Sequence, residues 1–338
     1  MRVVHVTESL GGGITSAVNA YASHSKQYKH YLFATIRSGD ATGEESEGAF
    51  QDLRLVLRNV AALCKFVSYI KQIKPNVIHV HSTYAGFFVR LIPFVTACKI
   101  VYTPHAYAFL RNDHPLKLKA YYFIEKLLSV RTAVVAGCGL DECNIAKCLN
   151  PRTPTIELVN VCDDLPVLER NGSSDLPVVA MLGRVCEQKG FQFFADAAVK
   201  LKGRAKFLWI GGGDSQGVET LKRAGVDVTG WIPRPECLQY LVNSDLYFHS
   251  AQWDGFPISV LEAAHYQLPM VLRDIGPFTA EGLSVVSSAN DAAVIITRFV
   301  EGDAETIHLV DENRNMVAEH HTSQLLAERL VELYSRFG

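Results

Sequence analysis

The sequence predicts an α/β protein of two Rossmann-like domains, each a doubly wound parallel sheet, that face each other across a cleft. Segments rich in Val, Ile and Leu alternate with helical segments, and this alternation runs twice along the chain. No long segment shows the pattern of consecutive antiparallel strands. The 338 residues suffice for two domains, each with its own hydrophobic core. We therefore place the first domain at residues 1–165 and the second at residues 175–320.

The first series starts with a strand at 2–6, a glycine-rich turn at Gly11–Gly13 and a helix that begins near Ile14. Because glycine has no side chain, the backbone N–H groups of this turn can approach a diphosphate closely. The turn is a poor dinucleotide fingerprint, since Ser16 stands where a third glycine is usual. Further strands are expected at 31–36, 77–81, 99–103, 133–135 and 155–159, helices at 53–74 and 115–128, and a mobile loop at 38–48.

A polar segment at 160–174, with Asp163-Asp164 and Asn171-Gly172, is expected to link the two domains. The second series follows it, with strands at 178–184, 206–210, 226–231 and 246–249, helices at 191–201, 218–224, 236–244 and from 258, and a final amphipathic helix at 323–337. Parallel sheets of this kind bind ligands at the carboxyl ends of their strands, so the cleft between the domains is the expected site.

The composition is that of a soluble globular protein, with 48% hydrophobic residues, 20% charged residues and a net charge of −2. The apolar start at 3–6 is too short for a signal peptide, and the longest apolar run, 87–102, is interrupted by basic residues. No C-x-x-C pair occurs, and the spacing of Cys138, Cys143 and Cys148 does not place them on one helix face. We therefore expect reduced thiols, no metal site and a cytoplasmic location.

The charges are distributed unevenly along the chain. Residues 54–131 carry 12 Lys and Arg but only 2 Asp and Glu, a net charge of +10, which leaves −12 for the rest. Several of these cations lie among apolar residues in the helices expected at 53–74 and 115–128. Such helices either rest on an anionic membrane surface or pack on the sheet with their lysines in solvent, and both alternatives stay open. In both cases the basic half favours an anionic partner.

The stretch from Tyr247 to Pro269 carries the strongest indication of a binding site. A strand is followed by the turn Asp254-Gly255-Phe256-Pro257 and by a helix. The free N–H groups and the positive dipole end at such a helix start can bind phosphate. The carboxylates of Asp254 and Glu262 flank this start and can accept hydrogen bonds from hydroxyl groups. This combination suits a nucleotide sugar, although the same turn also occurs as an ordinary strand-to-helix connection.

These residues resemble the acid-x7-acid motif of retaining GT-B glycosyltransferases of family 4, the glycosyl transferases group 1. The family usually has Glu at the first acidic position, where this chain has Asp254; one methylene less shortens the reach of the carboxylate and keeps its charge. Gly183-Arg184-x4-Lys189-Gly190 resembles the G-R-x4-K-G motif that binds the donor diphosphate in this family. An Arg and a Lys so placed can stabilise the charge that develops on the leaving nucleotide without a metal ion. The alternative is that both cations are surface residues of a loop.

The resemblance implies roles for further residues. Glu262 matches the position that binds the ribose hydroxyls, Asp254 the acid that orients the donor sugar, and His105 a histidine at the donor sugar and reaction centre. The resemblance and the glycine-rich turn together imply further donor-binding residues. These are Gly12, Gly13, Gly212, Trp231, Ile232, Ser259 and Val260. It also implies that a helix at about 321–338 crosses back to the first domain.

Other polar residues of the first domain are weaker candidates. His81 is a second possible site histidine, whereas His79 is expected to be a hydrogen-bonded core residue. The candidates for the acceptor side are Tyr107, Arg111 and Asn112.

The sequence thus predicts a retaining glycosyltransferase that moves a hexosyl group from a nucleotide diphosphate sugar, with UDP slightly favoured, to an acceptor hydroxyl. No cofactor and no metal are expected. The expected acceptor is a saccharide or a lipid-linked saccharide at the inner face of the cell membrane, as in bacterial O-antigen, capsule or exopolysaccharide assembly. No nucleic acid is expected as a partner. Two alternatives remain: a nucleotide-sugar epimerase on the same fold, and a catalytically silent nucleotide-sugar-binding protein.

Overall fold

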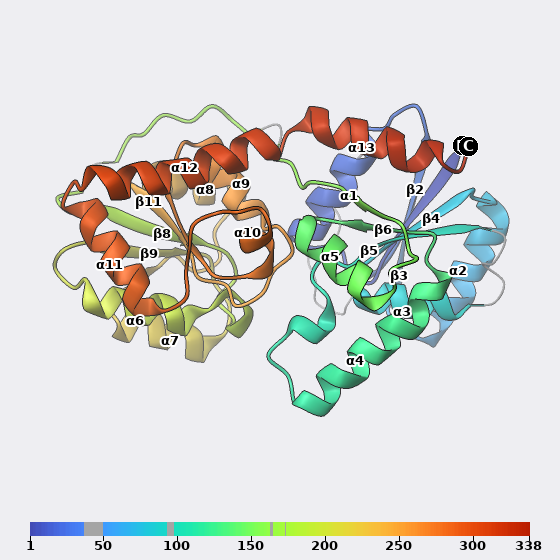
Figure 1. Cartoon of the computed structure of the whole chain (residues 1–338), viewed down its shortest axis with the longest axis horizontal. Helices are drawn as coiled ribbons and strands as arrows, with labels where there is room; N and C mark the ends of the chain where they lie inside the picture. Colours follow the sequence, from blue (N-terminus) through green and yellow to red (C-terminus); the bar gives the residue numbers. More distant parts are fainter. Residues whose placement is uncertain (37–49, 93–97, 163–164, 173) are drawn as a thin grey trace. The chain divides into compact units, whose positions relative to one another are not determined.

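The computed structural model describes residues 1–36, 50–92, 98–162, 165–172 and 174–338, which form two compact units (Figure 1). Unit 1 consists of Met1–Val161 together with Thr322–Gly338, and unit 2 of Cys162–His321. The mobile loop expected at 38–48 and the Asp163-Asp164 pair of the expected linker lie outside the described residues. Within the described ranges, no helix has both the length and the apolar character that a membrane span needs.

Unit 1 contains a seven-stranded sheet in the order β3-β2-β1-β4-β5-β6-β7, in which every neighbouring pair is parallel. Its strands are β1 (Arg2–Thr7), β2 (Lys29–Ile36), β3 (Phe50–Leu57), β4 (Val77–His81), β5 (Lys99–Thr103), β6 (Val134–Gly137) and β7 (Thr155–Glu157). The order reverses direction between β1 and β4, which makes the sheet doubly wound as predicted. The loops after β1, β4 and β5 therefore lie at one edge of the sheet, where ligands bind in this architecture.

The helices of unit 1 pack on both faces of this sheet and bury two hydrophobic clusters. They are α1 (Gly13–Ser23), α2 (Val60–Ile73), α3 (Thr83–Leu91), α4 (Pro115–Leu128), α5 (Leu140–Leu149) and α13 (Ser323–Ser335). The side chains of Leu326, Leu330, Leu333 and Tyr334 on α13 are fully buried in the cluster that α1 also covers. Residues 322–338 thus belong structurally to unit 1.

The helix expected at 53–74 begins later than predicted. Leu53, Leu55 and Leu57 alternate with other residues at the period of a strand, and this segment forms β3, paired with β2. The helix starts only at Val60, after Asn59 accepts a hydrogen bond from the N–H of Ala62 at 3.1 Å. The predicted start at residue 53 is wrong because the leucines of the strand also fit the apolar pattern of a helix.

A buried ion pair fixes α4 against α3. The guanidinium of Arg90 on α3 donates to Glu125 on α4 at 2.8 Å, and the hydroxyl of Tyr102 donates to the other carboxylate oxygen at 2.9 Å. Both charged side chains are almost completely buried. Because these contacts orient Glu125 inward, they determine which face of α4 is exposed to solvent.

Unit 2 contains a six-stranded parallel sheet in the order β10-β9-β8-β11-β12-β13. Its strands are β8 (Val178–Leu182), β9 (Lys206–Ile210), β10 (Asp227–Val228), β11 (Leu246–His249), β12 (Met270–Arg273) and β13 (Val285–Val286). Its helices are α6 (Phe191–Lys200), α7 (Ser215–Arg223), α8 (Arg234–Val242), α9 (Ile258–His265), α10 (Gly276–Ala280), α11 (Ala289–Val300) and α12 (Ala304–His320). The loops after β8, β9 and β11, which carry the predicted motifs, leave the sheet at its carboxyl edge. The prediction of two doubly wound parallel sheets is confirmed.

Candidate functional site

The loop from β11 to α9 holds the predicted acidic residues of unit 2. Pro257 is the N-cap of α9, one residue before the first helical position. The N–H of Val260 donates to the carbonyl of Pro257 at 3.1 Å, so in this structure it is not free for a ligand. The hydroxyl of Ser259 accepts a hydrogen bond from Tyr247 on β11 at 2.8 Å, which ties the first turn of α9 to the sheet.

The predicted cation Lys189 and the predicted acid Asp254 lie in direct contact, as a hydrogen-bonded ion pair between two loops. The same loops are joined through their backbones and side chains. Ser250 donates from its hydroxyl to the carbonyl of Lys189 at 2.9 Å, and the N–H of Gln252 donates to the carbonyl of Gln188 at 2.8 Å. The loop at 183–190 is therefore held against the loop that precedes α9.

A glycine makes this close approach possible. Gly190 has φ of +71°, and a Cβ atom at this position would lie 2.0 Å from the carbonyl oxygen of Ser250. No other residue type fits this position without moving one of the two backbones. Arg184, the other predicted cation, is exposed at the start of the same loop, and within the described part of the chain its side chain has no ionic partner.

His249 lies beneath this ion pair and was not singled out from the sequence. It is completely buried at the end of β11, and its Nε2 lies 3.9 Å from Asp254 Oδ2. Burial lowers its pKa well below the usual value, and the charges of Lys189 and Arg273 lower it further. His249 is therefore neutral at physiological pH. Its position at the carboxyl end of a central strand was the one sequence signal that pointed to it.

Glu262, on the second turn of α9, faces a different partner. Its carboxylate is almost completely buried and pairs with the half-exposed Arg234 of α8 at 2.6 Å. Burial raises the pKa of Glu262, while Arg234 acts in the opposite direction. Arg234 was missed because it lies in no motif, and its role depends on how α8 packs beside α9. A ligand that hydrogen-bonds to Glu262 has to share this carboxylate with Arg234 or displace it.

The predicted nucleoside loops lie beside the 183–190 loop. The backbones of Val185 and Gly213 form an isolated bridge, and the N–H of Val185 donates to the carbonyl of Gly212 at 2.8 Å. A Cβ at Gly212 would lie 2.8 Å from the indole of Trp231, which is itself 74% exposed. Ile232 is half-buried against the core of unit 2. The exposed indole next to a side-chain-free backbone offers a flat apolar surface on which a planar base can stack.

The predicted residues of unit 1 lie at the carboxyl edge of its sheet. Gly12 caps α1 with φ of +53°, and Gly13 is the first residue of that helix. His105 follows β5 and, with Ala106, has a positive φ that is rare outside glycine. Its ring nitrogens contact His81 at 3.1 Å and Cys138 at 3.0 Å, and burial lowers its pKa to about 4.

The remaining candidates of unit 1 divide between the core and the surface. His79 is buried, with hydrogen bonds at 2.8 Å to Tyr334 and to Thr103, as expected for a core histidine. Tyr107 is only 1% exposed and packs against Tyr102 and Phe109, so the structure places it in the core and not on an acceptor surface. Arg111 and Asn112 are exposed.

Residues 176–298 match the model of the family described as glycosyl transferases group 1. A Klebsiella pneumoniae protein described as an uncharacterized 41.2 kDa protein in the cps region is 24% identical over 99% of this chain and 98% of its own length. An Escherichia coli UDP-Gal:alpha-D-GlcNAc-diphosphoundecaprenol alpha-1,3-galactosyltransferase is 22% identical over 82% of this chain and 80% of its own length. Among solved structures, HepE from Anabaena in complex with UDP-glucose superposes with a TM-score of 0.77 over 99% of this chain and all of HepE, at 15% identity. The shared fold is GT-B.

Proposed function

We propose that this chain, whose residues 176–298 match the model of the glycosyl transferases group 1, transfers a hexosyl group from a nucleoside diphosphate sugar to a hydroxyl group with retention of configuration. The observation that carries the proposal is the contact between Lys189 and Asp254, which joins the two predicted motifs at the carboxyl edge of one sheet. Arg184 stands on the same loop. The residues that the proposed reaction needs thus lie together at one edge of the sheet.

We propose a mechanism in which these charges act on the donor. Cleavage of the sugar–phosphate bond leaves negative charge on the diphosphate, and Lys189 and Arg184 are placed to stabilise it as it develops. Asp254 is engaged by Lys189, so we assign it the role of orienting the donor sugar and not that of a nucleophile. The departing phosphate then accepts the proton of the acceptor hydroxyl on the same face of the sugar. The proposed mechanism uses no metal ion, because the two cations carry the charge stabilisation.

The donor nucleotide is proposed to lie along the loops after β8, β9 and β11. Gly212, Trp231 and Ile232 would contact the base, Glu262 the ribose hydroxyls, and Ser259 with Val260 the distal phosphate. For Val260 this requires release of its hydrogen bond to Pro257. From unit 1 we propose Gly12, Gly13 and His105 as further contacts of the donor. Uridine is the favoured base, since HepE is described with UDP-glucose and the Escherichia coli relative is named for UDP-Gal.

The proposed acceptor is a saccharide carried on a lipid diphosphate, and α4 provides the surface that reaches the membrane. Leu116, Phe123 and Leu127 of α4 and the adjoining Val130 are 62–77% exposed, although all four are large and apolar. They recur at helical spacing on the face opposite the buried Glu125, and Lys119 and Lys126 lie along one edge of this face. An apolar stripe flanked by lysines is the pattern of a helix that lies in the interface of an anionic bilayer.

The decisive experiment is a binding and product assay with a panel of UDP-, GDP-, ADP- and dTDP-sugars. A ligand that binds only the folded state raises the melting temperature, and we expect this for a UDP-sugar in the absence of added metal. Product analysis then follows transfer to a synthetic lipid diphosphate saccharide. An altered free sugar nucleotide without acceptor would indicate an epimerase, and a thermal shift without any turnover would indicate a binding protein. No shift with any sugar nucleotide would contradict the donor site itself.

The membrane proposal predicts lipid-dependent flotation. Wild-type protein is expected to float with vesicles that contain an anionic lipid and to remain behind with purely zwitterionic vesicles. Replacing Phe123 and Leu127 with serine is expected to lower the bound fraction at least about tenfold, because each apolar side chain contributes about 1.5–3 kcal/mol when buried. The matched control is Val199→Ser, which removes a similarly exposed apolar side chain from α6 of unit 2. Equal flotation of the control and the α4 variant would contradict the proposal.

A further inference from the structure

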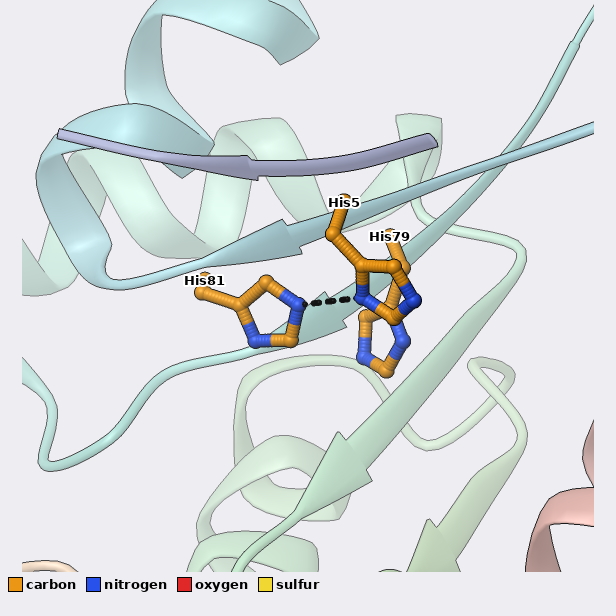
Figure 2. Close-up of side chains that lie close together, drawn as sticks. All are labelled: His5, His79 and His81. Atoms are coloured by element: carbon orange, nitrogen blue, oxygen red, sulfur yellow. Dashed lines mark hydrogen bonds between the residues drawn. The ribbon is translucent and has the colours of Figure 1, made fainter. Parts of the chain in front are cut away.

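Unit 1 contains a row of four histidines, three of them completely buried and the fourth, His105, half-buried, that crosses its sheet one strand at a time. His30 on β2, His5 on β1, His81 on β4 and His105 after β5 occupy neighbouring strands, and Cys138 follows β6. The ring contacts are 3.0 Å between His30 Nδ1 and His5 Nε2, 3.0 Å between His5 Nδ1 and His81 Nε2, 3.1 Å between His81 Nδ1 and His105 Nε2, and 3.0 Å between His105 Nδ1 and Cys138 Sγ. Figure 2 shows the contact between His5 and His81. We call this set the histidine row.

The rings of the histidine row are neutral. His5 and His81 are completely buried, and burial together with the neighbouring rings lowers their pKa values well below the usual value. Burial also lowers the pKa values of His30 and His105. A neutral imidazole carries one N–H group and one unprotonated nitrogen. Each ring in the row must therefore donate to one neighbour and accept from the other, so the choice made by one ring fixes the choice of all.

Ser25 sets the direction of the row. His30 Nε2 lies 3.0 Å from the carbonyl oxygen of Ser25, which can only accept a hydrogen bond. It also lies 3.0 Å from the hydroxyl of Ser25, whose proton is engaged by the carbonyl of Tyr21 at 2.6 Å. Both neighbours of His30 Nε2 are thus acceptors, and this nitrogen carries the proton. It follows ring by ring that His5, His81 and His105 also carry their protons on Nε2, which leaves Nδ1 of His105 as an acceptor that faces the thiol of Cys138.

We propose that Ser25, His30, His5 and His81 are positioning residues that hold His105 as the neutral Nε2–H tautomer, with Nδ1 as its hydrogen-bond acceptor. The relevance of this tautomer to a sugar rests on the proposed function. A thiol is a weak hydrogen-bond donor, so Nδ1 is the nitrogen of His105 that exchanges its partner most readily. The group that replaces Cys138 there has to be a donor, which a sugar hydroxyl is.

A transition-metal site is the competing interpretation of the same rings. His5, His79 and His81 bring one nitrogen each within 4.8 Å of one another, which fits a three-histidine metal site (Figure 2). A metal ion needs unprotonated nitrogens from both His5 and His81 at their point of contact, whereas the row places one proton there. Both nitrogens of His79 already have hydroxyl partners, Tyr334 and Thr103. The hydrogen bonds are complete without a metal ion, and we therefore favour the row.

The test is the tautomeric state of the rings, measured by long-range 1H–15N correlation spectra of the full chain labelled with 15N-histidine. In the wild type we expect the Nε2–H pattern for His5, His30, His81 and His105, assigned through single His→Asn variants. An Nδ1–H pattern at His81 or His105, or a transition metal that co-purifies with the protein in equimolar amount, would overturn the proposal. This measurement requires neither donor nor acceptor, so its outcome is independent of the proposed function.

The variant His30→Asn tests whether the signal passes along the row. Asparagine retains a polar atom near the position of Nδ1 but can present either an oxygen or an N–H group to His5, so the direction is no longer imposed. We expect both tautomers at His105. The control is His79→Asn, which changes an equally buried ring outside the row and should leave His105 in the Nε2–H form. If transfer activity is found, kcat of His30→Asn should fall with the fraction of protein that remains in this form. An unchanged His105 spectrum in His30→Asn refutes the proposed coupling.

Discussion

Replacing Lys189 with alanine is expected to lower kcat for sugar transfer about a hundredfold or more, which is the usual cost of removing one group that stabilises developing charge. The substitution removes the cation that contacts Asp254 and leaves that half-buried carboxylate without its partner. Both the leaving diphosphate and Asp254 then lose the side chain of Lys189, which contacts Asp254 and is proposed to bind the diphosphate. Arg184→Ala, on the same loop, is expected to have an effect of similar size. The measurement is the initial rate of transfer at saturating donor.

The matched control for this prediction is Lys206→Ala. Lys206 also pairs with an aspartate of unit 2, Asp227, at 3.2 Å, but it lies at the start of β9, at the opposite end of the strand from the loops that carry the motifs. Its loss should leave turnover unchanged, since an exposed ion pair contributes little to stability. If Lys189→Ala retains turnover within a few-fold of Lys206→Ala, the diphosphate site has been placed on the wrong loop.

Gly190→Ala is expected to be nearly as damaging, although it alters no charge. The new methyl group would lie 2.0 Å from the carbonyl oxygen of Ser250, and the residue would keep a positive φ that alanine disfavours. The 183–190 loop has to move away from the loop before α9, which displaces Lys189 from Asp254. A shift of about 1 Å in such a group costs about a hundredfold in rate, so we expect a loss of this order in kcat.

Gly203→Ala separates the effect of backbone strain from the effect of the steric clash with Ser250. Gly203 has φ of +78°, close to that of Gly190, but no atom lies within 4 Å of the position of its Cβ. This variant should lose about 1–2 kcal/mol of unfolding free energy from backbone strain alone and keep its turnover. Urea unfolding and initial rates of both variants decide the matter. Equal turnover in the two would show that the close approach at Gly190 has no influence on the site.

The pattern of apolar and turn residues in the sequence is enough to predict an element whose ends are set by residues next to it in the chain. The strands at 77–81 and 99–103 and the helix at 115–128 agree with β4, β5 and α4 at every residue. The prediction of a helix from residue 53 is wrong because the leucines before Val60 fit the apolar pattern of a strand as well as that of a helix. The sequence gives no prediction for the helices α3 and α5 or for the elements from β12 to α12, because no turn or motif marks them, whereas the final helix at 323–337 is predicted and agrees with α13.

The parts of the site that the sequence did not reveal depend on contacts between distant segments. Lys189 and Asp254 belong to two motifs that the sequence analysis assigned to the same donor, and the structure brings them into contact. Arg234 and His249 belong to no motif, and only the packing of α8 beside α9 and the end of β11 bring them to the acids. The histidine row was equally hidden. Its members lie on strands that are far apart in the sequence. The order of strands along the chain does not tell which of them become neighbours in the sheet.

Because α13 belongs to unit 1, this unit can complete its fold only after the end of the chain has been synthesised. The sheet of unit 1 is translated first, but the helix that covers Tyr21 and His79 follows only after the whole of unit 2. A ribosome-bound chain that ends before residue 322 therefore carries an open hydrophobic face, with His79 lacking its Tyr334 partner. Unit 2, whose residues are contiguous, has no such dependence. The nascent protein is thus exposed to chaperones and aggregation mainly through the half that emerges first.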